Sequence, residues 1–375
     1  MEIAVLTSSR ADFGFYRPLL TALKKKHGIH ASLVVFGTHL SKEHGYTYSE
    51  ILNSGHKVYT TLDTQPKGDS PKAIVQTIGL VHAVFADFWE NNKFDLILCL
   101  GDRYEMFAAV SAAVPFNIPV AHISGGEETV GAIDNFYRHA LTHVATYHFT
   151  NTKKNALRVQ QLKGSSKNIY FTGSLAVDNI NATKLISVKK FKQQFHFDLS
   201  NPFILFTFHP ETANYRTNTE NALATKKLLL QLKINVLVTM PNADTMGNAI
   251  REKLSEAANE NKNITLAESL GSAGYYSALK HCDLVMGNSS SGIVEAASFN
   301  KYVINIGNRQ SGRERGNNIL DVKMNVGHIH KLISKVMSLP KRKMKNIYGD
   351  GKAAERISEI INKINLKNGY AKLRK

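Results

Sequence analysis

Cysteine is scarce in this sequence of 375 residues, with only Cys99 and Cys282 present, each beside an apolar, strand-like run. Two separated thiols of this kind predict neither a disulfide framework nor a metal site, and they fit a reducing compartment. Long apolar runs are absent, and the chain passes from Met1 directly into the apolar residues 3–6 without a basic segment. These absences predict no membrane span, no export signal and a cytoplasmic location.

Acidic residues are fewer than basic ones, with 30 Asp and Glu against 47 Lys and Arg, which gives a formal net charge of +17. Such an excess favours an anionic partner. The lysines are spread along the chain, and the sequence has no zinc knuckle, no aromatic RNA-binding motif and no basic heptad segment. We therefore expect a small phosphorylated ligand rather than specific nucleic acid.

Apolar, β-branched runs alternate with helical segments along the whole chain. The runs are residues 3–7, 31–36, 96–100, 120–123, 147–150, 203–208, 236–239, 284–286 and 302–306. This alternation predicts an α/β fold, in which parallel sheets are covered by helices on both faces. A chain of this length is too long for one typical core, so two domains are expected.

A break in the alternation lies around residues 175–202. It predicts an N-terminal Rossmann-like domain over residues 1–178 and a C-terminal Rossmann-like, nucleotide-binding domain over residues 179–352. The final segment, 353–375, begins with helical spacing and is expected to pack back on the first domain. We expect the two domains to face each other across a cleft, with ligand-binding residues where the strands end.

The stretch 287–295, Gly-Asn-Ser-Ser-Ser-Gly-Ile-Val-Glu, follows an apolar run and opens a helical segment. Small residues and free N–H groups at a helix start form an anion site, most often for phosphate. Glu295, about one turn further, could reach a sugar hydroxyl joined to that phosphate. The simpler alternative is a serine N-cap followed by an ordinary first-turn carboxylate. The candidate nucleotide-binding residues here are Asn288, Ser289, Ser290, Ser291, Gly292 and Glu295.

Other strand ends carry cationic side chains. Arg10 follows the first run and could neutralise a diphosphate, and Arg309 and Arg313 lie in a glycine-containing loop after the run 302–306. His209 ends the run 203–208, where it could donate to phosphate or transfer a proton. Each has a structural alternative, because the arginines could be solvated surface residues and the histidine a buried structural one.

Carboxylates follow two strands of the first half, Asp102 after the run 96–100 and Glu127 after the run 120–123. Asp134 and Arg138 are spaced i,i+4, so on a helix they would share one face and could form a simple ion pair. Several carboxylates beside arginines indicate acid–base chemistry next to a phosphorylated group. His139 and His143 have metal-site spacing but lack the glutamate of a zinc-peptidase helix, so no metal is expected.

Taken in order, these segments resemble the UDP-N-acetylglucosamine 2-epimerase family, most closely its hydrolysing branch, over nearly the whole chain. The segments that carry the resemblance are SSRAD (8–12), FGTH (36–39), GDRYE (101–105), AHISGGE (121–127), GAID (131–134), RH (138–139), FHP (208–210), the serine-rich stretch 287–295, RQ (309–310) and GR (312–313). The resemblance implies a GT-B-type fold with the active site between two domains, a homodimer, and no metal or redox cofactor.

The resemblance also implies roles for the candidate residues. Arg10, His209, Ser290 and Ser291 would hold the diphosphate, and Glu295 the ribose. Asp102, Glu127 and Asp134 would transfer protons, while Arg138 and Arg313 would orient them or the substrate. The non-hydrolysing branch usually has a lysine shortly after the first arginine and a glutamate at position 134. Because this chain has Arg17 and Asp134 there, no role is carried over to Arg17.

The implied reaction releases UDP and N-acetylmannosamine from UDP-N-acetylglucosamine through a 2-acetamidoglucal intermediate. The sugar C2 proton is not acidic, so it can leave only as the C1–O bond to UDP breaks, which requires both a base and leaving-group stabilisation. Three alternatives stay open at this point. They are the same reaction on UDP-2,4-diacetamido-2,4,6-trideoxyglucose, a GT-B glycosyltransferase, and a non-catalytic regulator that binds a nucleotide sugar.

Overall fold

A computed structural model describes residues 1–42, 46–65, 68, 70–130, 133–211, 217–241 and 247–364. Gly131 and Ala132 of the GAID segment and residues 365–375 of the predicted final segment lie outside this description. The chain forms two compact units. The first consists of Met1–Glu127, Asp134–Asn179 and Tyr348–Lys375, and the second of Glu128–Ile133 and Ile180–Ile347.

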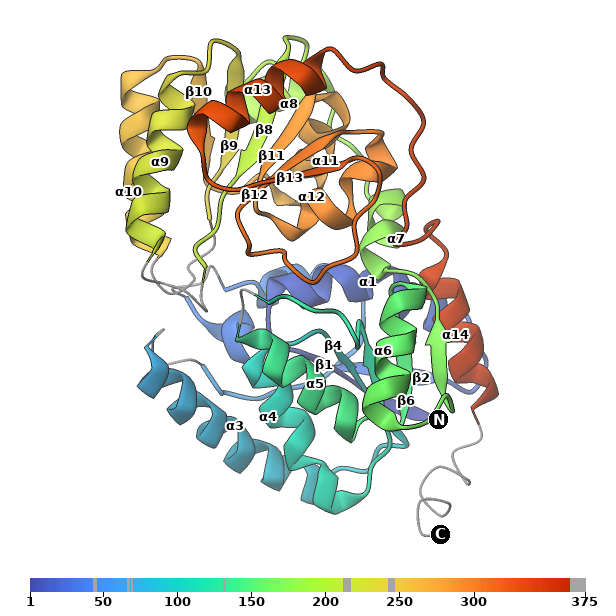
Figure 1. The fold of residues 1–375 in the computed structure, drawn as a ribbon. Coiled ribbons are helices and arrows are strands. Elements are labelled where there is room, and N and C mark those ends of the chain that lie inside the picture. The colour runs from blue at the N-terminus through green and yellow to red at the C-terminus, as the bar shows by residue number, and fades with distance from the viewer. Residues whose placement is uncertain are drawn as a thin grey trace. The chain divides into compact units, whose positions relative to one another are not determined.

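The first unit is built on a seven-stranded parallel sheet with the order β3-β2-β1-β4-β5-β6-β7. Figure 1 labels four of its strands, β1, β2, β4 and β6. Its strands are β1 (Glu2–Thr7), β2 (His30–Val35), β3 (Val58–Thr61), β4 (Leu96–Leu100), β5 (Val120–Ile123), β6 (Tyr147–Thr150) and β7 (Ile169–Phe171). The helices are α1 (Arg10–Lys24), η1 (Gly37–Leu40), α2 (Tyr48–Leu52), α3 (Pro71–Asn91), α4 (Tyr104–Ala112), η2 (Val114–Phe116), α5 (Asp134–Val144), α6 (Lys153–Lys163), most of α7 (Leu175–Ala182) and α14 (Ala353–Lys363).

The second unit has a six-stranded parallel sheet with the order β10-β9-β8-β11-β12-β13. Its strands are β8 (Phe203–Thr207), β9 (Asn235–Thr239), β10 (Ile264–Ala267), β11 (Leu284–Gly287), β12 (Val303–Ile306) and β13 (Ile319–Val322). The helices are α8 (Val188–Phe195), α9 (Asn218–Leu230), α10 (Gly247–Glu260), α11 (Gly271–His281), α12 (Ser290–Val294), η4 (Ala296–Phe299) and α13 (Val326–Met337).

Alternate residues of each central strand enter different cores. In β1, Ile3 and Val5 pack with α1 and α14, while Ala4 and Leu6 pack with α3 and α4 on the opposite face. The second sheet is likewise covered on both faces, by α9, α10 and α13 on one side and by α8 and α11 on the other. Since both faces are buried, these strands are continuous apolar runs rather than alternating ones. The two parallel sheets confirm the predicted α/β class with Rossmann-like units.

Helix α14 joins the core of the first unit. Its residues Ile357 and Ile361 are buried in the same cluster as the apolar face of α1. The carboxylate of Asp178 in α7 caps its start, because it accepts hydrogen bonds from the N–H groups of Ala353 (3.0 Å) and Ala354 (2.8 Å). The last described helix of the chain therefore completes the first unit.

A short excursion of the chain, Glu128–Ile133, groups with the second unit although both flanking segments belong to the first. The Val130 N–H donates to the Ser311 carbonyl oxygen at 2.9 Å. The domain limits predicted from the sequence place residues 128–133 within the first domain, because nothing in their composition separates them from their neighbours. Within the described part of the chain, no helix has both the length and the apolar character needed to cross a bilayer.

Candidate active site

Each sheet places candidate residues where its strand order reverses. In the first unit this point lies between β1 and β4, which are followed by Arg10 and Asp102. In the second unit it lies between β8 and β11, which are followed by His209 and Asn288. Ligands of open parallel sheets bind beyond the carboxyl ends of the strands at such points. The predicted residues therefore lie at the expected end of each sheet.

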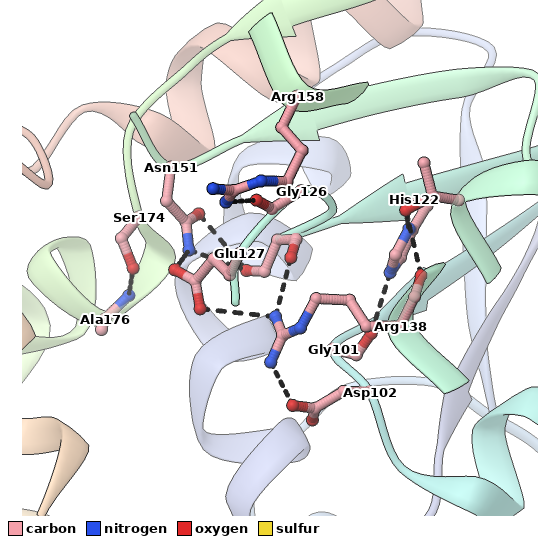
Figure 2. A network of polar contacts seen from close by, with 12 residues as sticks. Gly101, Asp102, His122, Gly126, Glu127, Arg138, Asn151, Arg158, Ser174 and Ala176 are labelled. Atoms are coloured by element: carbon pink, nitrogen blue, oxygen red, sulfur yellow. Dashed lines mark hydrogen bonds and ion pairs between the residues drawn. The ribbon is translucent and has the colours of Figure 1, made fainter. Parts of the chain in front are cut away.

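A buried guanidinium joins the carboxylates of the first unit (Figure 2). Arg138, on α5, has a side chain that is only 3% exposed. Its Nη1 donates to Glu127 Oε2 at 3.3 Å and to the Ser124 carbonyl oxygen at 2.8 Å, and its Nη2 pairs with Asp102 Oδ2. The predicted i,i+4 ion pair with Asp134 is thus replaced by contacts to two other strand ends. Side chains from the loop after β4, the turn after β5 and helix α5 thus meet at the charge of Arg138.

The turn after β5 aims Glu127 at this arginine. Ser124 has φ +65° and Gly126 has φ +75°, both in the left-handed region. A Cβ atom at Gly126 would overlap the Asn155 carbonyl oxygen of α6, so only glycine allows this close approach. Arg158, also on α6, donates to the Gly126 carbonyl oxygen at 2.8 Å. The turn is therefore fixed against α6 as well as against α5.

The cluster has more carboxyl groups than Arg138 pairs with, because Asp134 also lies close enough to interact with the charges of Asp102 and Arg138. Burial, followed by the nearby charge of Asp102, raises the pKa of Asp134 to about 6. The neighbouring Arg103 donates to Glu105 through Nε (3.2 Å) and Nη2 (2.9 Å), so its charge is paired with that of Glu105. Asp134 can therefore hold a proton at mildly acidic pH.

The turn after β1 is held by a buried carboxylate. Asp12 accepts hydrogen bonds from the N–H groups of Ser8 (2.9 Å) and Ser9 (3.1 Å), and its Oδ1 lies 3.7 Å from His39 Nε2. Burial opposes ionisation of Asp12, but His39 and these hydrogen bonds outweigh it and lower its pKa. Arg10 begins α1 directly after this turn, with its side chain 48% exposed. A rigid turn thus presents an accessible guanidinium.

In the second unit, Asn288 connects the ends of β8 and β11 to the loop after β12. Its side chain accepts from the His209 N–H (2.6 Å) and donates to the His209 carbonyl oxygen (2.8 Å). Its carbonyl oxygen accepts from Arg309 Nη1 (3.3 Å) and Gln310 Nε2 (2.9 Å). Burial, followed by the charge of Arg309, lowers the pKa of His209 to about 3. His209 is therefore a neutral imidazole that can donate one hydrogen bond.

The serine-rich turn follows Asn288. Ser289 is the N-cap of α12, and its Oγ accepts from the Ser291 N–H at 3.4 Å. Glu295 is buried and accepts from the hydroxyls of Tyr276 (Oε1, 3.0 Å) and Ser291 (Oε2). Burial raises the pKa of Glu295 to about 7, although both hydroxyls oppose the shift. The turn and the carboxylate are thus linked into one hydrogen-bonded unit.

The helix that opens at this turn is short. α12 covers only Ser290–Val294, Glu295 is its C-cap, and a 3₁₀ turn follows over Ala296–Phe299. Gly292 and the β-branched Ile293 and Val294 have lower helix propensity than alanine or leucine, which accounts for the early end. Glu295 nevertheless lies one turn after the serines.

The loop after β12 carries three arginines with different partners. Arg315 pairs with Asp321 of β13 at 3.1 Å, so its charge is used within the second unit. Arg309 contacts Asn288, and the Arg313 N–H donates to the Gln310 carbonyl oxygen at 3.3 Å. The predicted binding residues Arg309 and Arg313 therefore share a loop that is anchored on Asn288.

One member of the first cluster was not predicted. Asn151 follows β6 and donates to Glu127 Oε1 at 2.6 Å. The run 147–150 was recognised as a strand, so the rule that strand ends carry ligand-facing residues would have found Asn151. It was missed because an isolated asparagine carries no charge pattern.

Residues 21–362 match the family model described as UDP-N-acetylglucosamine 2-epimerase. The chain belongs to this family. A hydrolysing UDP-N,N'-diacetylbacillosamine 2-epimerase from Legionella pneumophila is 32% identical over 365 residues, covering 97% of this chain and 96% of the relative. The polysialic acid biosynthesis protein P7 from Escherichia coli is 32% identical over 348 residues, covering 90% and 88%.

Among solved structures, the UDP-N-acetylglucosamine 2-epimerase from Neisseria meningitidis, bound to UDP-N-acetylglucosamine, has the same fold. The TM-score is 0.84 with 19% identity, covering 97% of this chain and 100% of the other. These findings confirm the family recognised from the sequence. They also confirm the prediction of an enzyme, a hydrolysing nucleotide-sugar 2-epimerase.

Proposed function

We propose that this epimerase hydrolyses UDP-N-acetylglucosamine with inversion at C2 and releases UDP and N-acetylmannosamine. The observation that carries the proposal is the cluster in which Asp102 and Glu127 pair with the buried guanidinium of Arg138, while Asp134 lies close enough to interact with the charges of Asp102 and Arg138. A glycosyltransferase would use a nucleotide site but has no need for several carboxyl groups that exchange protons at C2.

The reaction begins with an elimination. A carboxylate takes the C2 proton, the C2–H electron pair forms the C1=C2 bond, and the C1–O electron pair leaves with UDP. A carboxyl group on the opposite face then gives a proton to C2, with the C1=C2 electron pair forming the new C2–H bond. Water adds at C1 and loses a proton to the carboxylate left behind, which gives the free manno sugar. The raised pKa of Asp134, about 6, favours it as the group that carries a proton, while Asp102 and Glu127, which pair with Arg138, are the candidate bases. No electron acceptor enters this balance, so the proposal includes no redox cofactor.

We propose that the residues around Asn288 bind the UDP leaving group. Asn288, Ser289, Ser290, Ser291 and Gly292 would present N–H and hydroxyl groups to the diphosphate. His209, Arg10, Arg309 and Arg313 would donate further hydrogen bonds or positive charge, and Glu295 would accept from the ribose. Because UDP carries the charge that develops at the leaving oxygen, these donors favour bond cleavage as well as binding.

A second substrate is favoured by one observation. The Legionella pneumophila relative, which is 32% identical over 97% of this chain, is named for UDP-N,N'-diacetylbacillosamine. The same elimination and hydration would act on such a 2,4-diacetamido-6-deoxy sugar, since the reacting atoms are again C1 and C2. The substrates differ only at C4 and C6, away from the carboxylate chemistry.

Incubation in D₂O with either UDP sugar tests both candidates. We expect UDP release together with N-acetylmannosamine that carries deuterium at C2, detected by NMR. Turnover of the diacetamido sugar alone would select the second candidate, and formation of UDP-N-acetylmannosamine would indicate the non-hydrolysing reaction instead. The predicted homodimer stays a prediction, which light scattering of the purified protein can check.

A further inference from the structure

Asn151 contacts the proposed acid–base cluster from its own strand end (Figure 2). The residue follows β6 and is 4% exposed. Its Nδ2 donates to Glu127 Oε1 at 2.6 Å and to Ser124 Oγ at 3.1 Å, and the Ser124 hydroxyl lies 3.3 Å from Asn151 Oδ1. Asn151 therefore links both ends of the turn after β5.

These contacts fix the direction of the amide group. A carboxylate oxygen can only accept, so the NH₂ group of Asn151 and not its oxygen must face Glu127. The serine hydroxyl can donate to the remaining amide oxygen. Ser124 itself has φ +65°, a conformation that a non-glycine residue holds only when its surroundings support it. Asn151 is thus part of what holds this turn.

Arg138 and Asn151 donate to different oxygens of Glu127. Oε2 accepts from Arg138 and Oε1 from Asn151, so each oxygen of the carboxylate is held by a separate donor. Donors to a carboxylate favour its ionised form. Charged groups nearby include Asp102, which shares Arg138, Asp134, which interacts with both of these charges, and Arg158 of α6, which donates to the adjacent Gly126 carbonyl oxygen.

We propose that Asn151 is a positioning residue that holds Glu127 oriented as the base for the C2 proton. The proton moves from C2 to a Glu127 oxygen, the C2–H electron pair forms the C1=C2 bond, and UDP departs with the C1–O pair. This inference rests on the proposed function. It divides the roles in the cluster, since it makes Glu127, rather than Asp102 or Asp134, the group that accepts the first proton.

Two substitutions at Asn151 test the inference. Asn151→Asp keeps the shape but puts a carboxyl group where Glu127 Oε1 receives its hydrogen bond, so the two groups must share a proton. We expect the acidic limb of the kcat/KM profile to move to higher pH by about one unit or more. Asn151→Ala removes the donor, and we expect kcat to fall about 10- to 100-fold, with KM changing less than about two-fold.

Asn117→Asp is the matched control. Asn117 is exposed and precedes β5, at the opposite end of the strand from Glu127. The substitution therefore adds the same charge without touching the cluster. Its pH profile should equal that of the wild type. UDP affinity, measured by calorimetry, and the melting temperature show whether each variant is folded.

The result that overturns the inference is a wild-type enzyme that turns over while folded Asn151→Asp and Asn151→Ala keep its pH profile and kcat. If the aspartate variant does not fold, the kcat of the alanine variant decides alone. Failure of the proposed function looks different, because the wild-type enzyme would then release neither UDP nor a C2-deuterated sugar from either substrate.

Discussion

At the scale of single residues, the cluster of the first unit depends on Arg138. Its guanidinium is almost completely buried and is paired with Glu127 and Asp102. Removing one partner of a buried ion pair leaves the other charge uncompensated, which typically costs about 3–5 kcal/mol. A substitution of Arg138 would therefore test stability together with chemistry. An exchange of carboxylate for amide at Glu127 keeps the shape and tests the chemistry more directly.

For Glu127→Gln we expect kcat to fall by about 10²- to 10⁴-fold, because an amide cannot accept the C2 proton. UDP affinity should be unchanged, since most of the proposed UDP ligands lie in the second unit. NMR in D₂O measures UDP release and deuterium at C2, and calorimetry measures UDP binding. Glu90→Gln, on an exposed position of α3, is the matched control. Wild-type turnover in Glu127→Gln would rule out the assigned role.

The residues of this cluster were only partly predictable. Asp102 and Glu127 were found because each follows an apolar strand, a pattern visible in the sequence. The partners of Arg138 were not, since i,i+4 spacing pointed to Asp134 while the guanidinium reaches two loops that are distant in sequence. Spacing along a helix identifies neighbours on that helix and carries no information about which strand end the helix faces.

At the scale of elements, Gly287 decides whether β11 can continue into the serine-rich turn. Its φ is +131°, and a Cβ atom there would overlap the Thr207 carbonyl oxygen of the neighbouring strand. We expect Gly287→Ala to destabilise the protein by about 4 kcal/mol or more, measured by urea denaturation. Gly164→Ala, at a left-handed helix end with open space, should cost only about 1 kcal/mol. Equal losses in the two variants would contradict this account.

Glu295 should make stability depend on pH. Its pKa is about 7 in the folded protein against a reference value of 4.5, so folding favours the protonated form. The stabilisation is therefore fully present below pH 4.5 and is lost as the pH rises through 7. When the pH rises from 5 to 8, we expect the unfolding free energy of the wild type to fall by about 2–3 kcal/mol more than that of Glu295→Gln.

Urea denaturation of the protein without UDP at the two pH values measures this difference. Glu252→Gln is the matched control, since the Glu252 side chain is 67% exposed in the same unit. This variant keeps Glu295 and should show the pH dependence of the wild type. An identical pH dependence for the wild type and Glu295→Gln would show that burial does not shift this group as proposed.

The strands missed by the sequence analysis share one property. Every predicted run became a strand inside a sheet, whereas the missed strands β3, β7, β10 and β13 are the four sheet edges. Edge strands are paired on one side only, and most of their residues here are partly or fully exposed. A run such as Val58–Thr61 therefore lacks the continuous apolar pattern that marks a strand buried on both faces.

At the scale of the whole molecule, the excursion Glu128–Ile133 connects the two halves of the proposed chemistry along the chain. Glu127 and Asp134, which flank it, belong to the first unit, while the excursion groups with the second. It is held there by the loop that carries Arg309 and Arg313, through the bond from Val130 to Ser311. A change in that loop should therefore alter the positions of the two carboxyl groups as well as the binding of UDP.

Gly312→Ala tests this connection. Gly312 has φ +91°, and an added Cβ would lie 2.8 Å from Glu128 Cβ, too close for an ordinary contact. The substitution should push the excursion away from the loop. We expect kcat for UDP release to fall about 10-fold or more, since displacements of about 1 Å at reacting groups have effects of this size.

Gly327→Ala, in α13 with only an ordinary contact nearby, is the matched control and should keep wild-type kcat. The measurement pairs steady-state kcat with calorimetric UDP affinity. A Gly312→Ala variant that binds UDP more weakly but keeps kcat would show that the loop acts on the nucleotide alone, and the excursion would then have no part in placing Glu127 and Asp134.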